Sequence, residues 1–402
     1  MKKNEFYKDS FSIFHVEILN KILAFLLKTK AKIKKIEFSK NDQKRLKETL
    51  LHGGLITCNH PTDFDPPSLY CLLRKENFKF RIMTARDVMF RTPYIFRKLI
   101  QMGGCFSVDR TKFDRKSLSR SIEILSNKKT LIVFPEGRTH GLSGNILPYQ
   151  AGPIKIALFS SKKTKSPIKI LPFAIYYSLI GTSSEKEKII ENRLKELEKM
   201  LDLKPDIRNL WQIRFMTITE SIIEKLEKEQ EATYNKKWRT KESRIKSINP
   251  RIKNLCEFSI KKIESELRIK PNKIDSLADR IQKAREANDF TKNIKRKAQI
   301  EKKVLMLHSL SSFHYTTPTP NTTYEKLEGI LTSLSKELFR VVGKKFTIKT
   351  QKKCHLALGE TIEIKSSDSN LPEALLEKLE ENTKKALKDL EKNNGTIIGS
   401  DH

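Results

Sequence analysis

Short β-rich runs alternate with helical patterns between residues 50 and 182. Four runs of strand length are rich in Ile, Val, Leu and Phe, and apolar residues at helical spacing separate them. The predicted strands are 54–58, 78–82, 130–134 and 168–177, and the predicted helices are 66–75, 87–101, 115–127 and 151–160. This alternation predicts a mixed α/β sheet flanked by helices, with functional loops at the carboxyl ends of its strands.

The pattern changes after residue 182. Long charged stretches with apolar residues about 3.6 positions apart and almost no glycine predict a helical block. The later elements predicted are a loop at 309–323, a helix at 324–342, strands at 346–349 and 356–364, and a helix at 372–392. Because strands return after the block, we predict a large all-helical insertion into the α/β domain. The predicted boundaries are 1–48 for an N-terminal segment, 49–182 for the α/β core, 183–342 for the insertion, and 343–402 for the closing strands and helix.

The N-terminal segment has the pattern of an amphipathic helix. Residues 11–27 carry apolar side chains at helical spacing, and a run of lysines without an intervening acid follows at 28–35. This combination suggests a membrane-interface helix in the headgroup region of an anionic bilayer. The alternative is a helix packed on its own domain with a solvated basic tail. Polar residues interrupt the stretch, so we do not expect a transmembrane helix.

Composition narrows the class of protein. The 402 residues include 80 Lys and Arg against 48 Asp and Glu, a formal net charge of +32. Residues 1–182 carry 34 basic and 14 acidic side chains, so the excess is largest there. A nucleic acid, an anionic membrane, a phosphorylated substrate or codon bias would each account for it. The five cysteines form no C-x-x-C pair, which argues against a disulfide framework or zinc ribbon and favours a reducing compartment.

The first candidate for chemistry directly follows the strand at 54–58. Pro61 prevents an ordinary helix through His60, and Asp65 before Pro66 is suited to be a helix N-cap. The four-residue loop between His60 and Asp65 can fold back, so that the carboxylate orients the imidazole and leaves one nitrogen as a base for a hydroxyl. Simple capping by Asp65 is the structural alternative.

Two further motifs end in arginine. One follows the strand at 130–134 and contains Glu136, Gly137 and Arg138, where a glycine turn would expose backbone N–H groups beside a guanidinium suited to phosphate. The other combines a glycine turn, a short strand and Arg110. Either alone would be typical of a surface turn.

In this order and spacing, the motifs resemble the glycerolphosphate/lysophosphatidic acid acyltransferase superfamily over roughly residues 50 to 180. The family has an N-H-x4-D element, a glycine-to-arginine element, an F-P-E-G element and a late proline-containing strand. These fall on Asn59, His60 and Asp65, on Gly104 to Arg110, on Phe134 to Arg138, and on Leu171, Pro172 and Phe173. Leu358 to Ile362 is similar to the family's closing strand.

The resemblance implies transfer of an acyl group from a CoA or acyl-carrier-protein thioester to a glycerol hydroxyl. It makes His60 the general base and Asp65 its charge and orientation partner. The binders of the acceptor phosphate would be Arg110, Glu136, Gly137 and Arg138. No cofactor or metal is implied, because the thioester is a co-substrate. The family commonly has E-G-T-R-S where this chain has Arg138, Thr139 and His140, which leaves the acceptor open.

We therefore predict a peripheral enzyme on the cytoplasmic side of a membrane that acylates 1-acylglycerol 3-phosphate to phosphatidic acid. The expected partners are an anionic membrane surface, a lysophospholipid or glycerol phosphate acceptor, and acyl-CoA or acyl-carrier protein. Residues 236–303 hold 22 basic and 9 acidic side chains but no nucleic-acid-binding signature, so nucleic acid is not expected. Three alternatives stay open: an acyltransferase for glycerol 3-phosphate or another lipid alcohol, a metal-dependent phosphoesterase using His60, Asp63 and Asp65, and a non-enzymatic basic adaptor.

Overall fold

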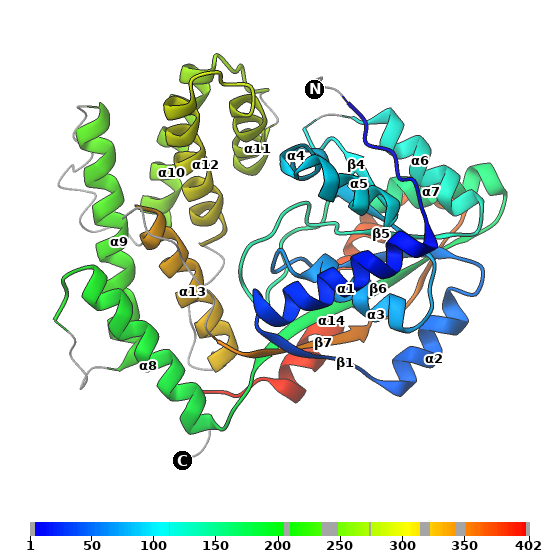
Figure 1. Ribbon diagram of the computed structural model, residues 1–402, viewed down its shortest axis with the longest axis horizontal. Coiled ribbons are helices and arrows are strands. Elements are labelled where there is room, and N and C mark those ends of the chain that lie inside the picture. Colours follow the sequence, from blue (N-terminus) through cyan, green and yellow to red (C-terminus); the bar gives the residue numbers. More distant parts are fainter. Residues whose placement is uncertain are drawn as a thin grey trace. The chain divides into compact units, whose positions relative to one another are not determined.

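The computed structural model divides the chain into two compact units, residues 1–180 with 348–395 and residues 181–347 with 396–402 (Figure 1). It describes residues 5–111, 113–204, 210–234, 248–272, 275–313, 322–341 and 350–398. Within these ranges, no helix is both long enough and apolar enough to cross a bilayer.

The first unit contains one mixed sheet, whose strand order is β1-β7-β6-β2-β5-β3-β4, with β8 beside β6. The strands are β1 (Ile33–Phe38), β2 (Gly54–Cys58), β3 (Phe80–Ala85), β4 (Cys105–Val108), β5 (Thr130–Val133), β6 (Ile168–Leu179), β7 (Lys352–Leu358) and β8 (Ile362–Ile364). β2 pairs in parallel with β5 and β6, whereas β6 pairs antiparallel with β7 and β8. The predicted mixed α/β sheet flanked by helices is confirmed.

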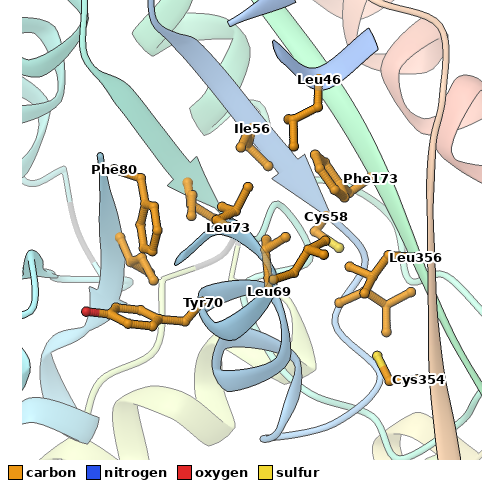
Figure 2. Packing of buried hydrophobic residues seen from close by; sticks show 14 of the residues in the cluster. Leu46, Ile56, Cys58, Leu69, Tyr70, Leu73, Phe80, Phe173, Cys354 and Leu356 are labelled. Carbon is orange, nitrogen blue, oxygen red and sulfur yellow. The ribbon is translucent and has the colours of Figure 1, made fainter. Parts of the chain in front are cut away.

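Helices cover both faces of this sheet (Figure 1). They are α1 (Ile13–Thr29), α2 (Lys40–Thr49), α3 (Asp65–Lys75), α4 (Arg86–Arg91), α5 (Tyr94–Met102), α6 (Arg115–Ser126), α7 (Gly152–Thr164) and α14 (Pro372–Asn394), with a short 3₁₀ turn at Ser366–Asn370. Successive strand residues point to opposite faces, so Ile56 and Phe173 pack with α1, α2 and α3, whereas Leu55 and Ile170 pack with α6, α7 and α14. Figure 2 shows the first of these cores, with Tyr70 of α3 against Phe80 of β3.

Three elements depart from the sequence prediction. The basic run after residue 28 leads into β1, which pairs in parallel with β7, and α2 follows. The predicted helix 87–101 is broken into α4 and α5 at Pro93, because proline disfavours helical backbone in the residue before it. The predicted strand 356–364 ends at Leu358, and the chain resumes as β8 at Ile362.

Helix α1 has apolar side chains on two faces. Val16, Leu19 and Leu27 are buried in the core, so the helix packs on its own domain. Phe14 and Phe25 are 70% and 65% exposed on the other side. The helix is therefore fixed by one apolar face while a second remains at the surface.

The segment before α1 is held to the edge of the sheet. Tyr7 and Ser107 of β4 exchange hydrogen bonds, at 2.8 Å from the Tyr7 N–H to the Ser107 hydroxyl. The Asp9 carboxylate, which is buried, accepts from Arg81 at 2.8 Å and from Arg120 at 2.7 Å. These contacts place the start of α1 against the core.

The second unit is helical where it is described. Its helices are α8 (Ser183–Met200), α9 (Trp211–Tyr234), α10 (Ile248–Leu267), α11 (Leu277–Asn288), α12 (Ile294–Phe313) and α13 (Tyr324–Val341). Paired Arg–Glu contacts join them, such as Arg214 with Glu198 and Arg280 with Glu264. Residues 309–313 of the predicted loop are the last residues of α12, so that part of the prediction is wrong. Residues 314–321 lie outside the described ranges, as does the predicted strand 346–349.

Candidate active site

The motif of His60 and Asp65 meets the motif of Phe134 to Arg138 because β2 and β5 are parallel neighbours, with Thr57 opposite Val133. Loops that follow neighbouring parallel strands leave the sheet at the same edge. His60 lies just after β2 and Glu136 just after β5, so two residues 76 positions apart are brought into contact. The motif residues therefore lie at the carboxyl ends of their strands, which is where the sequence analysis expects functional loops.

His60 and Asp65 form a hydrogen-bonded pair, with 2.8 Å between the imidazole Nδ1 and the carboxylate Oδ2. Asp65 is fully buried, whereas the His60 side chain is 16% exposed. The ring of Phe134 lies 4.4 Å from the imidazole ring between centroids. The imidazole is thus held by a carboxylate at one nitrogen and by an aromatic ring on its face, and it keeps some access to solvent.

Asp65 does not act as the predicted N-cap. Helix α3 begins at Asp65 itself, with Phe64 in the cap position. The Asp65 carboxylate points back into the loop, where its Oδ2 accepts from the Thr62 N–H at 2.7 Å and its Oδ1 from the Thr62 hydroxyl at 2.8 Å. The Tyr177 hydroxyl donates to Oδ1 at 2.6 Å. Buried charge of this kind is tolerated when hydrogen bonds satisfy it.

These contacts assign the proton on His60. A carboxylate offers only acceptors, so the nitrogen that contacts Asp65, Nδ1, must carry the hydrogen and Nε2 keeps its lone pair. Burial, followed by the nearby charge of Asp65, raises the pKa of the Tyr177 hydroxyl well above its usual range, so Tyr177 stays a donor. Burial likewise raises the pKa of the Cys58 thiol, so this neighbour stays protonated.

Glu136 is a buried carboxylate that supports the loop of His60. Its Oε1 accepts the backbone N–H of His60 at 2.7 Å, and its Oε2 accepts the N–H of Leu147 at 3.0 Å. The ring of His140, whose side chain is completely buried, places Nε2 at 3.2 Å from the same Oε2. Glu136 therefore holds main chain on both sides of the site, and His140, which had no role in the sequence prediction, contacts it.

Arg110 connects the loops that follow β4 and β5. Its guanidinium donates to the carbonyl of Gly137 at 2.5 Å and to the Asp87 carboxylate at 2.8 Å. Gly137 has a φ of +67°, which lies in the left-handed region that favours glycine, and a Cβ there would lie 2.8 Å from the terminal amide of the Gln150 side chain. Arg138 follows in the same turn and is half-buried.

Asp63 lies apart from the His60–Asp65 pair. Its carboxylate accepts from the Thr139 hydroxyl at 3.3 Å, and the N–H of Gly141 donates to the Pro61 carbonyl at 2.7 Å. The two motif loops are thus tied to each other by Thr139 and Gly141. Among the described residues, no three His, Cys, Asp or Glu side chains gather in a way that could hold a metal ion.

Two supporting residues were missed by the sequence analysis. Tyr177 of β6 is 112 positions from Asp65, and its place in an apolar strand gave no signal. Thr62 could have been found, because Thr62 and Asp65 have the T-x-x-D spacing of a capping box. Asn59, noted only as part of the motif, is fully buried and bonds both the N–H and the carbonyl of Ile175, at 2.7 and 3.1 Å.

One comparison with known proteins covers this region of the chain. A family model described as Acyltransferase matches residues 35–176, a range that starts within β1 and ends within β6. No curated protein matches the chain significantly. The matched range contains His60, Asp65, Arg110 and Glu136 in the arrangement described above. Residues 35–176 therefore form an acyltransferase domain of the glycerolphosphate/lysophosphatidic acid acyltransferase family.

Proposed function

We propose that this protein transfers a fatty acyl group from an acyl-CoA or acyl-carrier-protein thioester to the hydroxyl of 1-acylglycerol 3-phosphate. The observation that carries the proposal is the buried Asp65 carboxylate on Nδ1 of a partly exposed His60. This leaves Nε2 as a base beside the carboxyl edge of β2. An alcohol attacking a thioester needs such a base and no covalent enzyme intermediate.

The chemistry balances with His60 alone as the proton carrier. Nε2 takes the proton of the acceptor hydroxyl while the oxygen attacks the thioester carbonyl carbon. When the tetrahedral intermediate collapses, the carbon–sulfur bond breaks and the imidazolium returns the proton to the leaving thiolate. Asp65 stabilises the imidazolium formed between these steps, because its carboxylate faces Nδ1 at 2.8 Å.

The motif of Phe134 to Arg138 supports binding of the acceptor phosphate. Arg138, directly after the glycine turn at Gly137, supplies the guanidinium in this proposal. In this proposal Arg110 and Glu136 support the site through its backbone. Arg110 donates to the Gly137 carbonyl, and Glu136 accepts the backbone N–H of His60. The exchange of Arg and Thr in the motif leaves Thr139 to bind Asp63, so the phosphate contact falls to residue 138.

We also propose that the enzyme works as a peripheral protein on the cytoplasmic side of an anionic membrane. The outward face of α1 supports this, because Phe14, Ile18 and Phe25 are exposed there with Lys21 and Lys28. Apolar side chains with interleaved cations favour the headgroup region of an anionic bilayer. The acceptor and the acyl donor would meet at that surface.

The test uses the purified full-length chain with labelled acyl-CoA or acyl-carrier protein and, in parallel, lysophosphatidic acid, other lysophospholipids and glycerol 3-phosphate. Mass spectrometry of the product identifies donor and acceptor together. We expect phosphatidic acid, formed in the presence of EDTA and lost in His60→Ala. Another acylated product would correct the acceptor. Loss of activity in EDTA with recovery on adding zinc or manganese would instead favour the phosphoesterase-like reading of His60, Asp63 and Asp65.

A further inference from the structure

We propose that one corner of the helical unit is a second contact with the anionic bilayer, separate from α1. The corner consists of Arg268, Phe290, Lys292, Ile294, Lys295 and Arg296. The inference rests on the membrane association in the proposed function, and it assigns a role to part of the helical unit that the acyl-transfer chemistry leaves unexplained.

Hydrogen bonds bring these residues together. The Arg296 guanidinium donates to the carbonyl of Glu266 at 2.8 Å, which places the first turn of α12 at the C-terminal end of α10. The Lys297 ammonium donates to the carbonyl of Asp289 at 2.7 Å, and the Asn288 side chain donates to the Lys297 carbonyl at 2.9 Å. The turn between α11 and α12 therefore folds against the same first turn, beside Arg268.

Apolar side chains project from this corner. Ile294, the first residue of α12, is 83% exposed, and Phe290 in the preceding turn is 41% exposed. Ile300, one and a half turns further along α12, is by contrast buried at 1% exposure. The exposed isoleucine therefore belongs to the end of the helix and not to the face that packs in the bundle.

The charged side chains between residues 290 and 300 have one sign. Residues 290–300 contain four basic side chains and no acid, and Lys292, Lys295 and Arg296 are exposed. Lys295, Arg296 and Lys297 occupy the first helical turn, where the partial positive charge of the helix makes cations unfavourable. Asn293 caps the helix by accepting from the Arg296 N–H at 3.0 Å, so the turn is formed despite this repulsion. An anionic surface would relieve it.

A bilayer fits these features better than an acidic protein. Ile294 stands between Lys292 and Lys295, so insertion of the apolar side chain below the lipid phosphates would leave both ammonium groups at phosphate level. A folded acidic partner would need an apolar pocket matched to these protruding side chains. One membrane-binding element is seldom enough for stable attachment to a bilayer, and this corner would supply a second one in addition to α1.

The test measures binding of the full-length protein to vesicles of phosphatidylcholine with about a third phosphatidylglycerol. We expect K292E/K295E to lower the partition coefficient about tenfold or more, and Ile294→Ser to lower it severalfold. The matched control is K253E/K261E, which reverses two exposed lysines on α10 of the same unit. Its effect should stay within about twofold, and vesicles of phosphatidylcholine alone should bind every variant weakly.

Several outcomes would overturn the proposal. Equal losses in K292E/K295E and K253E/K261E would mean that only the overall charge matters, and an unchanged Ile294→Ser would contradict insertion. Unchanged vesicle binding in K292E/K295E, together with lost binding to an acidic acyl-carrier protein, would assign the corner to a protein partner. Acyl transfer to a detergent-dispersed acceptor, expected to be unchanged in these variants, separates this proposal from the catalytic one.

Discussion

The carboxylate of Glu136 lies 2.7 Å from the backbone nitrogen of His60 and so fixes the main chain from which the catalytic imidazole of the proposed mechanism projects. This glutamate is completely buried, and its second oxygen is bonded to the N–H of Leu147. A residue of the motif after β5 thereby supports the backbone of the motif after β2. In the proposed mechanism Glu136 positions the backbone of His60 and does not touch the substrate, so its substitution should affect kcat more than KM.

Glu136→Gln should weaken both folding and turnover. An amide can accept from only one of the two backbone N–H groups, so one buried donor loses its partner, at a cost of about 1–3 kcal/mol. Denaturant unfolding should show this loss, and kcat should fall while KM for the acyl donor changes little. The exposed Glu363→Gln, in the same unit, is the control and should leave both quantities unchanged. A raised KM with normal kcat would show instead that Glu136 binds substrate.

Asp65→Asn should lower kcat about 10²- to 10⁴-fold with little change in KM. The amide nitrogen can donate to Nδ1, which moves the imidazole proton to Nε2 and removes the base. Steady-state kinetics with labelled thioester would measure the effect. Asp63→Asn changes the neighbouring exposed carboxylate, which contacts Thr139, and should cost less than about threefold. Equal losses in the two variants would refute the assigned pair.

Tyr177→Phe should reduce kcat by about tenfold, because it removes the hydroxyl that donates to the Asp65 carboxylate at 2.6 Å. The N–H and hydroxyl of Thr62 still donate to Asp65 in this variant, so the carboxylate stays in place but is held by fewer bonds. Tyr176→Phe removes a hydroxyl from the opposite face of the same strand and serves as the matched control. Steady-state kinetics would measure the effect, and a kcat in Tyr177→Phe equal to that of the wild type would mean that the hydroxyl only fills space.

Asp9→Asn should destabilise the protein at neutral pH by about 3 kcal/mol, because it leaves the buried Arg81 guanidinium without its carboxylate and removes one of the two carboxylates that pair with the half-buried Arg120. Burial would raise the pKa of Asp9, but the hydrogen bonds from Arg120 and Arg81 outweigh it and hold the pKa below its usual value. A lowered pKa gives stability that is present above about pH 4 and is lost as pH falls through the folded value.

The difference between wild type and Asp9→Asn should therefore shrink in acid. Urea unfolding at pH 7 and near pH 3 would measure it, with the exposed Asp389→Asn as a control that shows little difference at either pH. A difference that stays constant between the two pH values would mean that the charge of Asp9 does not hold the N-terminal segment.

Local sequence patterns were enough for part of the site. His60 and Asp65 could be paired from the sequence because four intervening residues limit how far apart they can lie, and the strand before them was visible in its composition. The glycine requirement at Gly137 also followed from a local turn. Contacts made across the sheet could not be predicted, because the pairing of β2 with β6 brings Tyr177 to Asp65 without any pattern in either segment.

The missed elements have equally physical reasons. β1 was hidden because a lysine-rich edge strand shows only part of the apolar alternation, since its outward face is solvated. The break at Pro93 was missed because apolar residues keep helical spacing on both sides of the proline, so residues 87–101 were predicted as one helix. Asp65 was expected at the N-cap from its local sequence preference, but its carboxylate instead makes four hydrogen bonds, to residues of the loop and to Tyr177 of β6.

The side chain of Asn59 takes the place of a peptide group. Its amide offers Ile175 one acceptor and one donor, as a strand backbone would, at the residue where the main chain turns out of the sheet. Aspartate lacks the donor and glutamine has a longer reach, so neither is an equivalent substitute. Asn59 thereby extends the hydrogen bonding between β2 and β6 one residue beyond Cys58, the last residue of the strand, so the loop of His60 starts from a point that is fixed to the sheet.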